Sequence, residues 1–306
     1  MKYMSIRIVF MGSPAFALPT LSRLAKSYHV VGVITQPDRA SGRGREVKSP
    51  PVKTLALELN IPIMQPEKIR APEAMEQLRV WDPELIVVAA FGQILKKDVL
   101  EMPRYGCINV HASLLPRWRG AAPINAAILA GDEEIGVTIM QMDVGLDTGP
   151  MFAMKSIRVK PDDTADSVLQ TLSTLGADLL AETLPEYLSG NLAPVPQPAH
   201  GATYAPMLKK EDGLLDFNHS AIELERRVRA MNPWPGAWFE CKGNPLKVLR
   251  ASTVSVEKGL TSGSRFIVDG KPAVQSAEGA LVLDEIQPAG RKIMSGKSFL
   301  AGTRDW

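Results

Sequence analysis

The sequence contains little cysteine. Among its 306 residues there are two, Cys107 and Cys241. Two cysteines cannot build the disulfide framework that stabilises small secreted domains, and they cannot supply a cysteine-rich zinc site. We therefore expect no disulfide network and no metal, and the low cysteine content fits a protein of the reducing cytoplasm.

Long apolar runs are also absent. A transmembrane helix needs about 18 consecutive apolar residues, and no such run occurs, so we expect no membrane span. The N-terminal residues lack the apolar core of a secretory signal. A hydrophobic fraction of 45% over this length predicts a globular chain, and two domains are the natural expectation.

A strong charge of one sign is missing as well. The 35 basic and 33 acidic residues give a net charge of +2, which by itself does not indicate a nucleic-acid-binding protein. Their distribution is uneven, because residues 207–306 hold 15 basic and 12 acidic side chains. This local excess of positive charge favours a polyanionic partner for the second half of the chain.

The first 35 residues predict a β-α-β unit. Residues 6–11 form an apolar run, residues 18–28 carry apolar side chains near helical spacing, and residues 30–35 form a second strand-like run. Together with the continuous apolar run at residues 85–90, this pattern predicts a parallel sheet. The turn after the first strand lacks both Gly-x-Gly-x-x-Gly and the phosphate-binding P-loop pattern, so a nucleotide site is poorly supported.

A polar loop at residues 36–50 is rich in positive charge. Two glycines make it flexible. Its basic residues and glycines are Arg39, Arg43, Arg45, Lys48, Gly42 and Gly44. The loop is either a solvated surface segment or an arm that contacts phosphates.

The stretch from residue 107 to residue 120 is central to the functional interpretation. Asn109 and His111 lie two residues apart at the end of a short apolar strand, so their side chains share one face. Ligands of parallel α/β sheets bind outside the carboxyl ends of strands. The pair therefore predicts a site in which one side chain polarises an oxygen and the other donates or moves a proton. The structural alternative is a core histidine with a satisfied ring.

A carboxylate follows in a tight loop after the next predicted strand, residues 136–142. Asp147 lies between glycines in Gly-Leu-Asp-Thr-Gly-Pro. A negative charge there would pair with His111 and favour its protonated form. The alternative for Asp147 is an ordinary turn residue whose side chain bonds its own backbone.

These motifs, taken in order, resemble those of one enzyme family. Asn-x-His is followed by Ser-Leu-Leu-Pro-x-x-Arg-Gly, and then by the loop that contains Asp147. This order is similar to that of the formyltransferases that use 10-formyltetrahydrofolate, and the resemblance continues almost from end to end. Within the family, the sequence is most similar to members that act on initiator methionyl-tRNA.

The resemblance implies transfer of a formyl group from 10-formyltetrahydrofolate to the α-amino group of methionine on initiator methionyl-tRNA, which yields N-formylmethionyl-tRNA for translation initiation. Asn109 and His111 would donate to the oxygen that becomes negative during the reaction. Asp147 would keep His111 charged and help to carry the proton from the amine to N10 of the folate.

The resemblance also implies two groups of folate-binding residues. Ser113, Leu114, Leu115 and Pro116 would shape the folate site. The second group, which follows the strand at residues 85–90, comprises Phe91, Gln93 and Ile94. The alternative for the second group is an ordinary strand-to-helix turn.

Other acceptors and another class of protein are the competing interpretations. Glycinamide ribonucleotide and amino-sugar formyltransferases share the Asn-His-Asp constellation, so that constellation indicates the chemistry and not the acceptor. A nucleotide-binding or RNA-binding module without catalysis is the alternative from a different class. The three residues, intact and in the right order, argue against it.

Residues 1–190 are predicted to form a Rossmann-like parallel-sheet formyltransferase domain, and residues 191–207 a Pro-rich linker. Before the linker, Pro185 is expected to interrupt a long helix. Residues 208–306 are expected to form an OB-like β-barrel that binds tRNA, with a shortened hairpin near residues 257–265.

In this second half, Ser220 and Glu223 form a capping-box pattern that predicts a helix to about Met231. Short strands are expected at residues 238–242, 245–254, 265–268, 272–276 and 280–287. The resemblance implies that the basic loop contacts tRNA through Arg43 and Arg45, and the basic excess of the second half favours tRNA contacts by Lys209 and Lys210. A monomer without a membrane or an obligate protein partner is expected.

Overall fold

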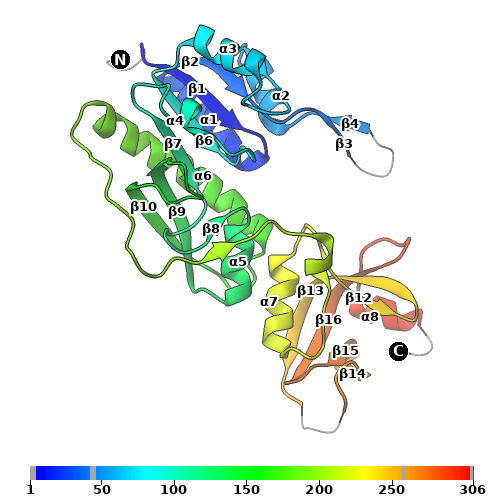
Figure 1. Cartoon of the computed structure of the whole chain (residues 1–306). Coiled ribbons are helices and arrows are strands. Elements are labelled where there is room, and N and C mark those ends of the chain that lie inside the picture. Colours follow the sequence, from blue (N-terminus) through cyan, green and yellow to red (C-terminus); the bar gives the residue numbers. More distant parts are fainter. Residues whose placement is uncertain (1–4, 42–45, 257–259, 304–305) are drawn as a thin grey trace. The chain divides into compact units, whose positions relative to one another are not determined.

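The computed structural model describes residues 5–41, 46–256, 260–303 and 306, which form two compact units. The first unit contains the segments Met1–Pro123, Glu134–Ile157 and Leu169–Tyr204. The second contains Ile124–Glu133, Arg158–Val168 and Ala205–Trp306. Figure 1 traces the chain, which leaves the first unit and returns to it twice before the second unit is completed.

One sheet organises the first unit. Seven strands of the described residues lie in the order β10-β9-β7-β6-β1-β2-β5. The pairings from β7 to β5 are parallel, whereas β9 runs antiparallel to β7. The strands are β1 (Arg7–Gly12), β2 (His29–Ile34), β5 (Ile63–Met64), β6 (Leu85–Ala89), β7 (Cys107–His111), β9 (Glu134–Gln141) and β10 (Met151–Arg158).

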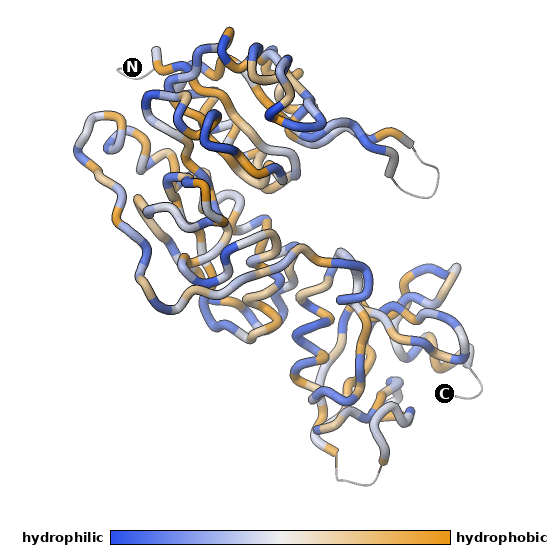
Figure 2. Tube along the Cα trace, viewed as in Figure 1, coloured by the Kyte–Doolittle hydropathy of each residue, from blue (hydrophilic) through white to orange (hydrophobic). Residues whose placement is uncertain are grey.

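Helices cover both faces of this sheet, which explains why its central strands are continuously apolar. All five residues of β6 are buried, and Figure 2 shows hydrophobic residues along the strands. On one face, Met75 and Leu78 of helix α3 (Pro72–Trp81) pack with residues of β1 and β6. On the other face, Gly176 of helix α6 (Ala165–Leu188) lies against Val110 of β7. The fold is therefore a three-layer α/β/α arrangement.

The remaining elements of this part of the chain are short. A two-residue strand, β8 (Arg119–Gly120), pairs with β11 (Tyr204–Ala205). The other elements are η1 (Ala15–Ala17), α1 (Leu18–Ser27), β3 (Arg39–Ser41), β4 (Glu46–Lys48), α2 (Pro51–Glu58), α4 (Lys97–Leu100) and α5 (Pro123–Ala130).

Helix α6 corrects one expectation, because it continues through Pro185 and ends at Leu188. A proline removes one backbone donor and crowds the preceding turn. However, Leu184 and Leu188 on either side of it are both buried. The Ser189 amide also donates to the Pro185 carbonyl, which keeps the last turn closed. Packing of the apolar face outweighs the local cost of proline at this position.

The second unit is built on an antiparallel sheet. In the described residues its strands follow the order β12-β13-β16-β15-β14, with β17 paired to β16, and this order does not close into a ring. The strands are β12 (Ala237–Cys241), β13 (Asn244–Val254), β14 (Arg265–Val268), β15 (Lys271–Gln275), β16 (Ala280–Pro288) and β17 (Met294–Ser295). A small β-rich unit after a Rossmann-like parallel sheet confirms the predicted fold class. The hairpin expected near residues 257–265 falls partly on residues 257–259, outside the described residues.

Helix α7 (Ala221–Ala230) packs on this sheet through Leu224 and Val228. Its predicted capping box is confirmed, because Ser220 Oγ accepts from the Glu223 amide while Glu223 Oε2 accepts from the Ser220 amide at 2.9 Å. Ser220 Oγ also donates to Glu223 Oε2 at 2.7 Å. This hydrogen bond, followed by the one from the Ser220 amide, holds the pKa of Glu223 below its usual value. The last elements are η2 (Lys210–Gly213) and α8 (Gly296–Ala301).

The second unit also includes most of helix α5, which comes well before the unit's main segment, Ala205–Trp306, in the sequence. Asn125 Nδ2 donates to the Ala230 carbonyl at 2.6 Å, and Leu129 packs against the apolar core of the unit. Cutting the chain after the first unit would therefore remove the partner of α5. Among the described residues, no helix is long and apolar enough to cross a membrane.

Candidate active site

Strand β7 presents Asn109 and His111 on one face. Alternate residues of a strand point to the same side, and Cys107 on that side belongs to the core beneath α3. The Asn109 side chain is 8% exposed and that of His111 is 6% exposed. Two buried polar side chains at the end of an otherwise apolar strand need hydrogen-bond partners. They find these partners in two loops.

Asp147 reaches this pair from a loop that folds back over the sheet. Because β9 is antiparallel to β7, it ends beside the start of β7, where the Met142 amide donates to the Cys107 carbonyl. Residues 142–150 then return across the face of β7. The loop is tight: a Cβ on Gly149 would lie 1.9 Å from the Gln141 carbonyl oxygen, so only glycine fits there.

The three predicted catalytic residues form one cluster. Asn109 Nδ2 donates to Asp147 Oδ1 at 3.5 Å, and His111 Nδ1 lies 3.8 Å from Asp147 Oδ2. The Gly120 amide donates to the same Oδ2 at 2.9 Å. The Asp147 carboxylate is therefore held between a main-chain donor and two side chains from β7. Within the described residues, the 3.5 Å contact is the one hydrogen bond of the Asn109 amide, which leaves donor capacity for a ligand.

The second ring nitrogen of His111 faces the turn that follows β7. His111 Nε2 lies 3.1 Å from the carbonyl oxygen of Trp118, and a protonated Nε2 donates to it. Trp118 has a φ of 60°, a left-handed conformation that points its carbonyl inward. Arg117 covers the indole ring, with its guanidinium carbon 4.4 Å from the ring centroid. Each ring nitrogen of His111 thus faces an oxygen atom.

The predicted folate segment at residues 113–116 forms a hydrogen-bonded corner. Ser113 Oγ donates to the Arg117 carbonyl at 2.7 Å, and Thr138 Oγ1 donates to the Ser113 carbonyl at 2.7 Å. Thr138 Oγ1 also accepts from the Leu115 amide at 3.1 Å. Ser113 and Leu115 are buried, whereas Leu114 and Pro116 are half-buried. The two half-buried side chains are the ones of this segment that can contact a ligand.

The three residues predicted after β6 have different environments. Phe91 is buried in the core, and its carbonyl accepts from Gln36 Nε2 at 3.0 Å. The amide of Gln93 is used at both ends, since its Oε1 accepts from the Ile69 amide and its Nε2 donates to the Pro66 carbonyl. Ile94 is 77% exposed. Of the three, Ile94 is the most exposed, whereas Gln93 is half-buried.

The predicted tRNA arm begins at the end of β2 and forms the hairpin β3–β4. Its tip, which includes Arg43 and Arg45, lies outside the described residues. The base is anchored by Asp38, which accepts hydrogen bonds from Lys53 Nζ at 2.5 Å and from Gln65 Nε2 at 2.8 Å. The hydrogen bond from Gln65, followed by that from Lys53, lowers the pKa of Asp38.

Lys209 and Lys210 belong to the second unit, at the start of η2. Both side chains are exposed. The Lys209 amide donates to Asp212 Oδ2 at 2.6 Å, which fixes the backbone of this turn. The structure therefore leaves both ammonium groups at the surface, on a unit separate from the cluster around Asp147.

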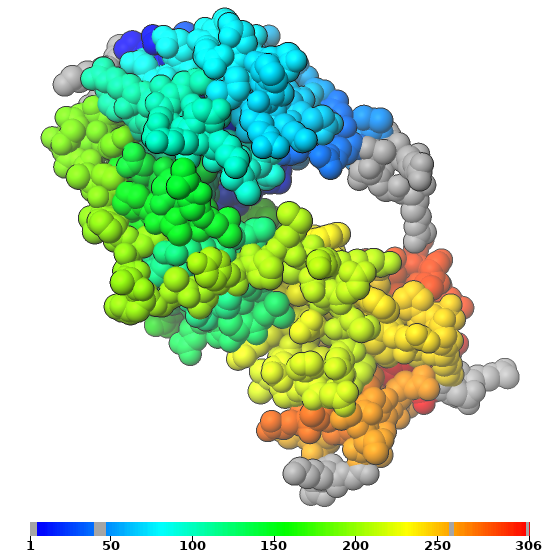
Figure 3. Space-filling view, in the orientation of Figure 1, coloured from blue at the N-terminus to red at the C-terminus, as the bar shows by residue number. Residues whose placement is uncertain are grey.

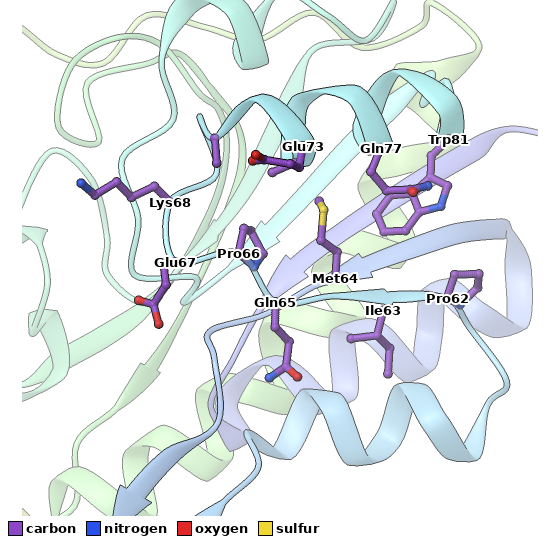
Figure 4. Close-up of a pocket in the computed structure, with 12 residues that line it drawn as sticks. Pro62, Ile63, Met64, Gln65, Pro66, Glu67, Lys68, Glu73, Gln77 and Trp81 are labelled. Atoms are coloured by element: carbon purple, nitrogen blue, oxygen red, sulfur yellow. The ribbon is translucent and has the colours of Figure 1, made fainter.

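A large pocket of the first unit lies elsewhere. A groove of about 650 Å³ runs between β5 and α3, with Met64 and Trp81 among its apolar lining residues and Lys68 and Gln77 among its polar ones (Figure 4). None of the residues predicted for catalysis or folate binding lines it. The functional interpretation therefore depends on the cluster at β7 and not on this groove. In the described part of the chain, no group of three or more His, Cys, Asp or Glu side chains is placed to hold a metal ion.

Sequence reasoning did not find one polar residue that completes the cluster. Gln197, in the predicted linker, donates through Nε2 to the carbonyl oxygens of Asp147 and Gly149, each at 2.8 Å. Nearby, the Trp118 amide donates to Thr203 Oγ1 at 2.9 Å. The available signal was weak: a lone amide side chain between prolines. Its partners lie about 50 residues away and belong to the main chain, which no sequence motif records.

Comparison with known proteins assigns the family. Residues 6–184 match the model of the family described as "Formyl transferase", and residues 207–304 match "Formyl transferase, C-terminal domain". The chain belongs to the formyl transferase family. A methionyl-tRNA formyltransferase from Myxococcus xanthus is 49% identical over 298 residues, which cover 97% of this chain and 95% of the relative.

Solved structures agree on the fold. A methionyl-tRNA formyltransferase from Clostridium thermocellum superimposes with a TM-score of 0.58 at 16% identity, covering 95% of this chain and all of that one. An N-formyltransferase from Helicobacter canadensis, solved with folinic acid and dTDP-3-aminofucose, gives a TM-score of 0.66 at 16% identity and covers 92% and 99% of the two chains. The predicted membership in the methionyl-tRNA formyltransferases is confirmed by the sequence relatives, and the chain is a formyltransferase enzyme.

Proposed function

We propose that this formyltransferase moves a formyl group from 10-formyltetrahydrofolate to the α-amino group of methionine on initiator methionyl-tRNA. The observation that carries the proposal is the single cluster of Asn109, His111 and Asp147 in a chain of this family. The choice of acceptor is supported by relatives named methionyl-tRNA formyltransferase that match nearly the whole chain. The product, N-formylmethionyl-tRNA, would serve translation initiation in the cytoplasm.

In this mechanism the neutral amine of methionine attacks the formyl carbon. A C–N bond forms, the carbonyl oxygen becomes negative, and the bond from carbon to N10 of the folate then breaks. The free hydrogen of the Asn109 amide donates to the negative oxygen. His111 also donates to it when that oxygen replaces the Trp118 carbonyl as the acceptor for Nε2. Such donors act because they are already in place when the charge develops.

Asp147 compensates the charge on His111 and receives the proton that the amine loses. Its carboxylate lies 3.8 Å from His111 Nδ1 and is 15% exposed, so it retains a path to water. The proton passes from the amine to N10, directly through Asp147 or through an intervening water molecule, and it leaves with tetrahydrofolate. Atoms and charge balance without any metal or redox step.

Substrate contacts are divided between the two units in this proposal. Folate binds beside the corner at residues 113–116 and the segment that contains Phe91, Gln93 and Ile94, where Leu114 and Ile94 offer accessible apolar surface. The tRNA is contacted by Arg43, Arg45, Lys209 and Lys210. We assign catalysis to residues 1–190, and tRNA binding to residues 208–306 together with Arg43 and Arg45. Residues 191–207 join the two regions, and their part up to Tyr204 belongs to the first compact unit. The protein acts as a monomer.

Formylation of a defined acceptor tests this proposal. The purified chain is incubated with 10-formyltetrahydrofolate and with initiator tRNA charged with methionine, and N-formylmethionine is measured after the ester is hydrolysed. Glycinamide ribonucleotide and a nucleotide-linked amino sugar are offered in parallel. We expect formylation of the tRNA and none of the small acceptors. Preferential formylation of a small amine would overturn the choice of acceptor, and formylation by His111→Ala at the wild-type rate would overturn the site.

A further inference from the structure

The side chain of Gln197 joins two loops that belong to the active site. Its Nε2 donates to the carbonyl oxygens of Asp147 and Gly149. Its Oε1 accepts from Nε and Nη2 of Arg119 at 3.1 and 2.6 Å. Every hydrogen-bonding atom of this amide is therefore engaged, and no bond goes to a neighbouring residue in sequence. An amide side chain with all its partners in place has a fixed orientation.

The Asp147 loop needs such an external partner. Asp147 has a φ of 52°, a left-handed conformation that is unfavourable for a residue with a side chain and persists only where its surroundings fix it. Within the loop, Asp143 accepts from the Gly145 amide and from Thr148 Oγ1, which stabilises the first half. The carbonyls of Asp147 and Gly149 in the second half accept from Gln197.

The Oε1 atom of Gln197 is also connected to the Asp147 carboxylate, through Arg119 and Gly120. Arg119, which donates to Gln197 Oε1, directly precedes Gly120, whose amide donates to Asp147 Oδ2. The Arg119 amide in turn donates to the Thr203 carbonyl at 2.9 Å. Gln197 therefore constrains both the main chain of Asp147 and the main-chain donor that holds its carboxylate. The contacts form a closed ring: Asp147, Gly120, Arg119, Gln197 and back to Asp147.

The rest of the predicted linker keeps Gln197 in place. The amides and carbonyls of Met151 and Val195 exchange two hydrogen bonds of 2.8 Å, which fixes the chain two residues before Gln197. Thr203 binds the turn at Trp118 after it. Residues 190–204 run over the surface of the first unit past β9 and β10, as the yellow-green segment in Figures 1 and 3 shows. Most of the predicted linker therefore belongs to the first unit.

We propose that Gln197 is a positioning residue for formyl transfer: it sets the Asp147 carboxylate against His111 and Asn109, and it does so through backbone carbonyls and without touching substrate. The inference rests on the proposed function, because it assigns the effect to the transfer step. It predicts a loss in kcat with little change in KM for either substrate, since the groups that bind folate and tRNA are left in place.

Two substitutions separate positioning from a merely structural role. Gln197→Met keeps the volume and removes every hydrogen bond. Gln197→Glu keeps the acceptor for Arg119 but turns a carboxylate oxygen towards the carbonyls of Asp147 and Gly149, which repels them. Asn191→Ala, at the exposed start of the same segment, is the matched control, because its side chain bonds Glu186 and not the active-site loops.

We expect kcat to fall by up to about 100-fold in Gln197→Glu and Gln197→Met, as displacement of a catalytic group by about 1 Å does. The control should match the wild type. Wild-type kcat in Gln197→Glu would show that the Arg119 contact alone matters, and wild-type kcat in Gln197→Met would show that packing alone matters. Either result would overturn the proposal.

A double variant provides a readout that a structural role would not give. If Gln197 acts through the carboxylate of Asp147, Gln197→Glu should cost little further kcat once Asp147→Asn has removed that carboxylate. If the two losses multiply, Gln197 acts independently of Asp147, and the proposal fails. Both single variants and the double variant are compared at saturating substrates, so that binding does not enter the result.

Hydrogen exchange tests the positioning without any substrate. The Gly120 amide reports directly on the place of the Asp147 carboxylate, to which it donates. We expect its exchange to accelerate at least tenfold in Gln197→Glu, with unchanged exchange for amides of β6 and for the Asn191→Ala control. Unchanged exchange at Gly120 would overturn the positioning role. If the wild-type chain fails to formylate methionyl-tRNA while Gln197→Glu still accelerates exchange at Gly120, the proposed function alone is refuted.

Discussion

The loops around Asp147 and the hairpin β3–β4 belong to the same unit and are held in different ways. Hydrogen bonds join the Asp147 loop to Gly120 on one side and to Gln197 on the other. The hairpin has its side-chain anchor at the base, where Asp38 meets Lys53 and Gln65. Chemistry requires groups that are in place before the charge develops. Recognition of a large polyanion depends on charge that can be presented at the surface.

The comparison predicts different kinetic signatures for the two regions. A change at the fixed cluster should lower the rate at saturating substrate, whereas a change at the hairpin should weaken the use of tRNA and leave the saturated rate alone. The first three of the four predictions that follow test this difference, beginning with the largest expected effect, and the fourth tests the burial of the strand that carries the cluster.

Removing a residue of the cluster should have the largest effect. His111→Ala deletes a donor to the developing oxyanion, and we expect a loss of about 100- to 1000-fold in kcat with folate binding largely intact. Asp147→Asn keeps the shape but removes the negative charge, and a comparable loss is expected. The double variant should be little worse than either single one, because the residues act together. Steady-state kinetics and folate binding by calorimetry measure these quantities. Losses that multiply would show that the two residues act separately.

Arg43→Ala should have a smaller effect, which falls on the KM for methionyl-tRNA and not on kcat. We expect KM for methionyl-tRNA to rise strongly at low salt while kcat and folate binding stay close to wild type, because a phosphate contact is lost. Raising the salt concentration should narrow the gap between variant and wild type, since screening weakens the same contact in both. Arg43→Lys should recover part of the affinity. A wild-type KM for Arg43→Ala at low salt would remove this residue from acceptor recognition.

Asp38→Asn tests the base of the hairpin and should have a weaker effect than Arg43→Ala. The pKa of Asp38 is lowered from 3.8 in the folded chain, so the hydrogen bonds that stabilise its carboxylate are fully present above that value. Their contribution is lost as the pH falls through the lowered pKa. We therefore expect a modest rise in the KM for tRNA near neutral pH and no stability difference between variant and wild type in strong acid, measured by denaturant unfolding. A difference that persists in acid would contradict this account.

The two cysteines should differ in their reactivity towards thiol reagents. Burial raises the pKa of Cys107 to about 12, and this residue lies on the catalytic strand β7. Cys241 on β12 is half-buried. At pH 8 we expect a thiol reagent to modify Cys241 alone in the native chain and both residues after denaturation. The pKa of Cys107 is raised from 9.0 to about 12 in the folded chain, so the folded chain holds the thiol proton more tightly than the unfolded chain does. The stability that this group contributes is fully present below pH 9.0 and is lost as the pH rises towards 12. Rapid native labelling of Cys107 would contradict its burial.

Much of the fold was predictable because local patterns and packing agree. The apolar run of β6 and the capping box at Ser220 and Glu223 are both found where the sequence predicts them. The helix through Pro185 was not predictable, because its stability comes from the burial of Leu184 and Leu188 rather than from local preference. The antiparallel direction of β9 was also not predictable, because nothing in the residues of this strand indicates it.

The same distinction applies to the candidate site. Asn109 and His111 can be paired from strand periodicity, and Asp147 from the tight glycine loop, and the structure brings all three side chains together. Gln197 was not predicted because its side chain bonds two backbone carbonyl groups, and residues of every type carry a backbone carbonyl. Side chains that bind main chain across a fold become visible only when the fold is known.

One measurement tests the division of labour most directly. Single-turnover formylation is followed at saturating methionyl-tRNA and saturating 10-formyltetrahydrofolate, with His111→Ala and Arg43→Ala measured beside the wild type. The account predicts that Arg43→Ala reaches the wild-type rate once the tRNA saturates, whereas His111→Ala stays at least about 100-fold slower at any concentration. If His111→Ala is restored by saturation, or if Arg43→Ala remains slow, chemistry and recognition are not divided between these two regions.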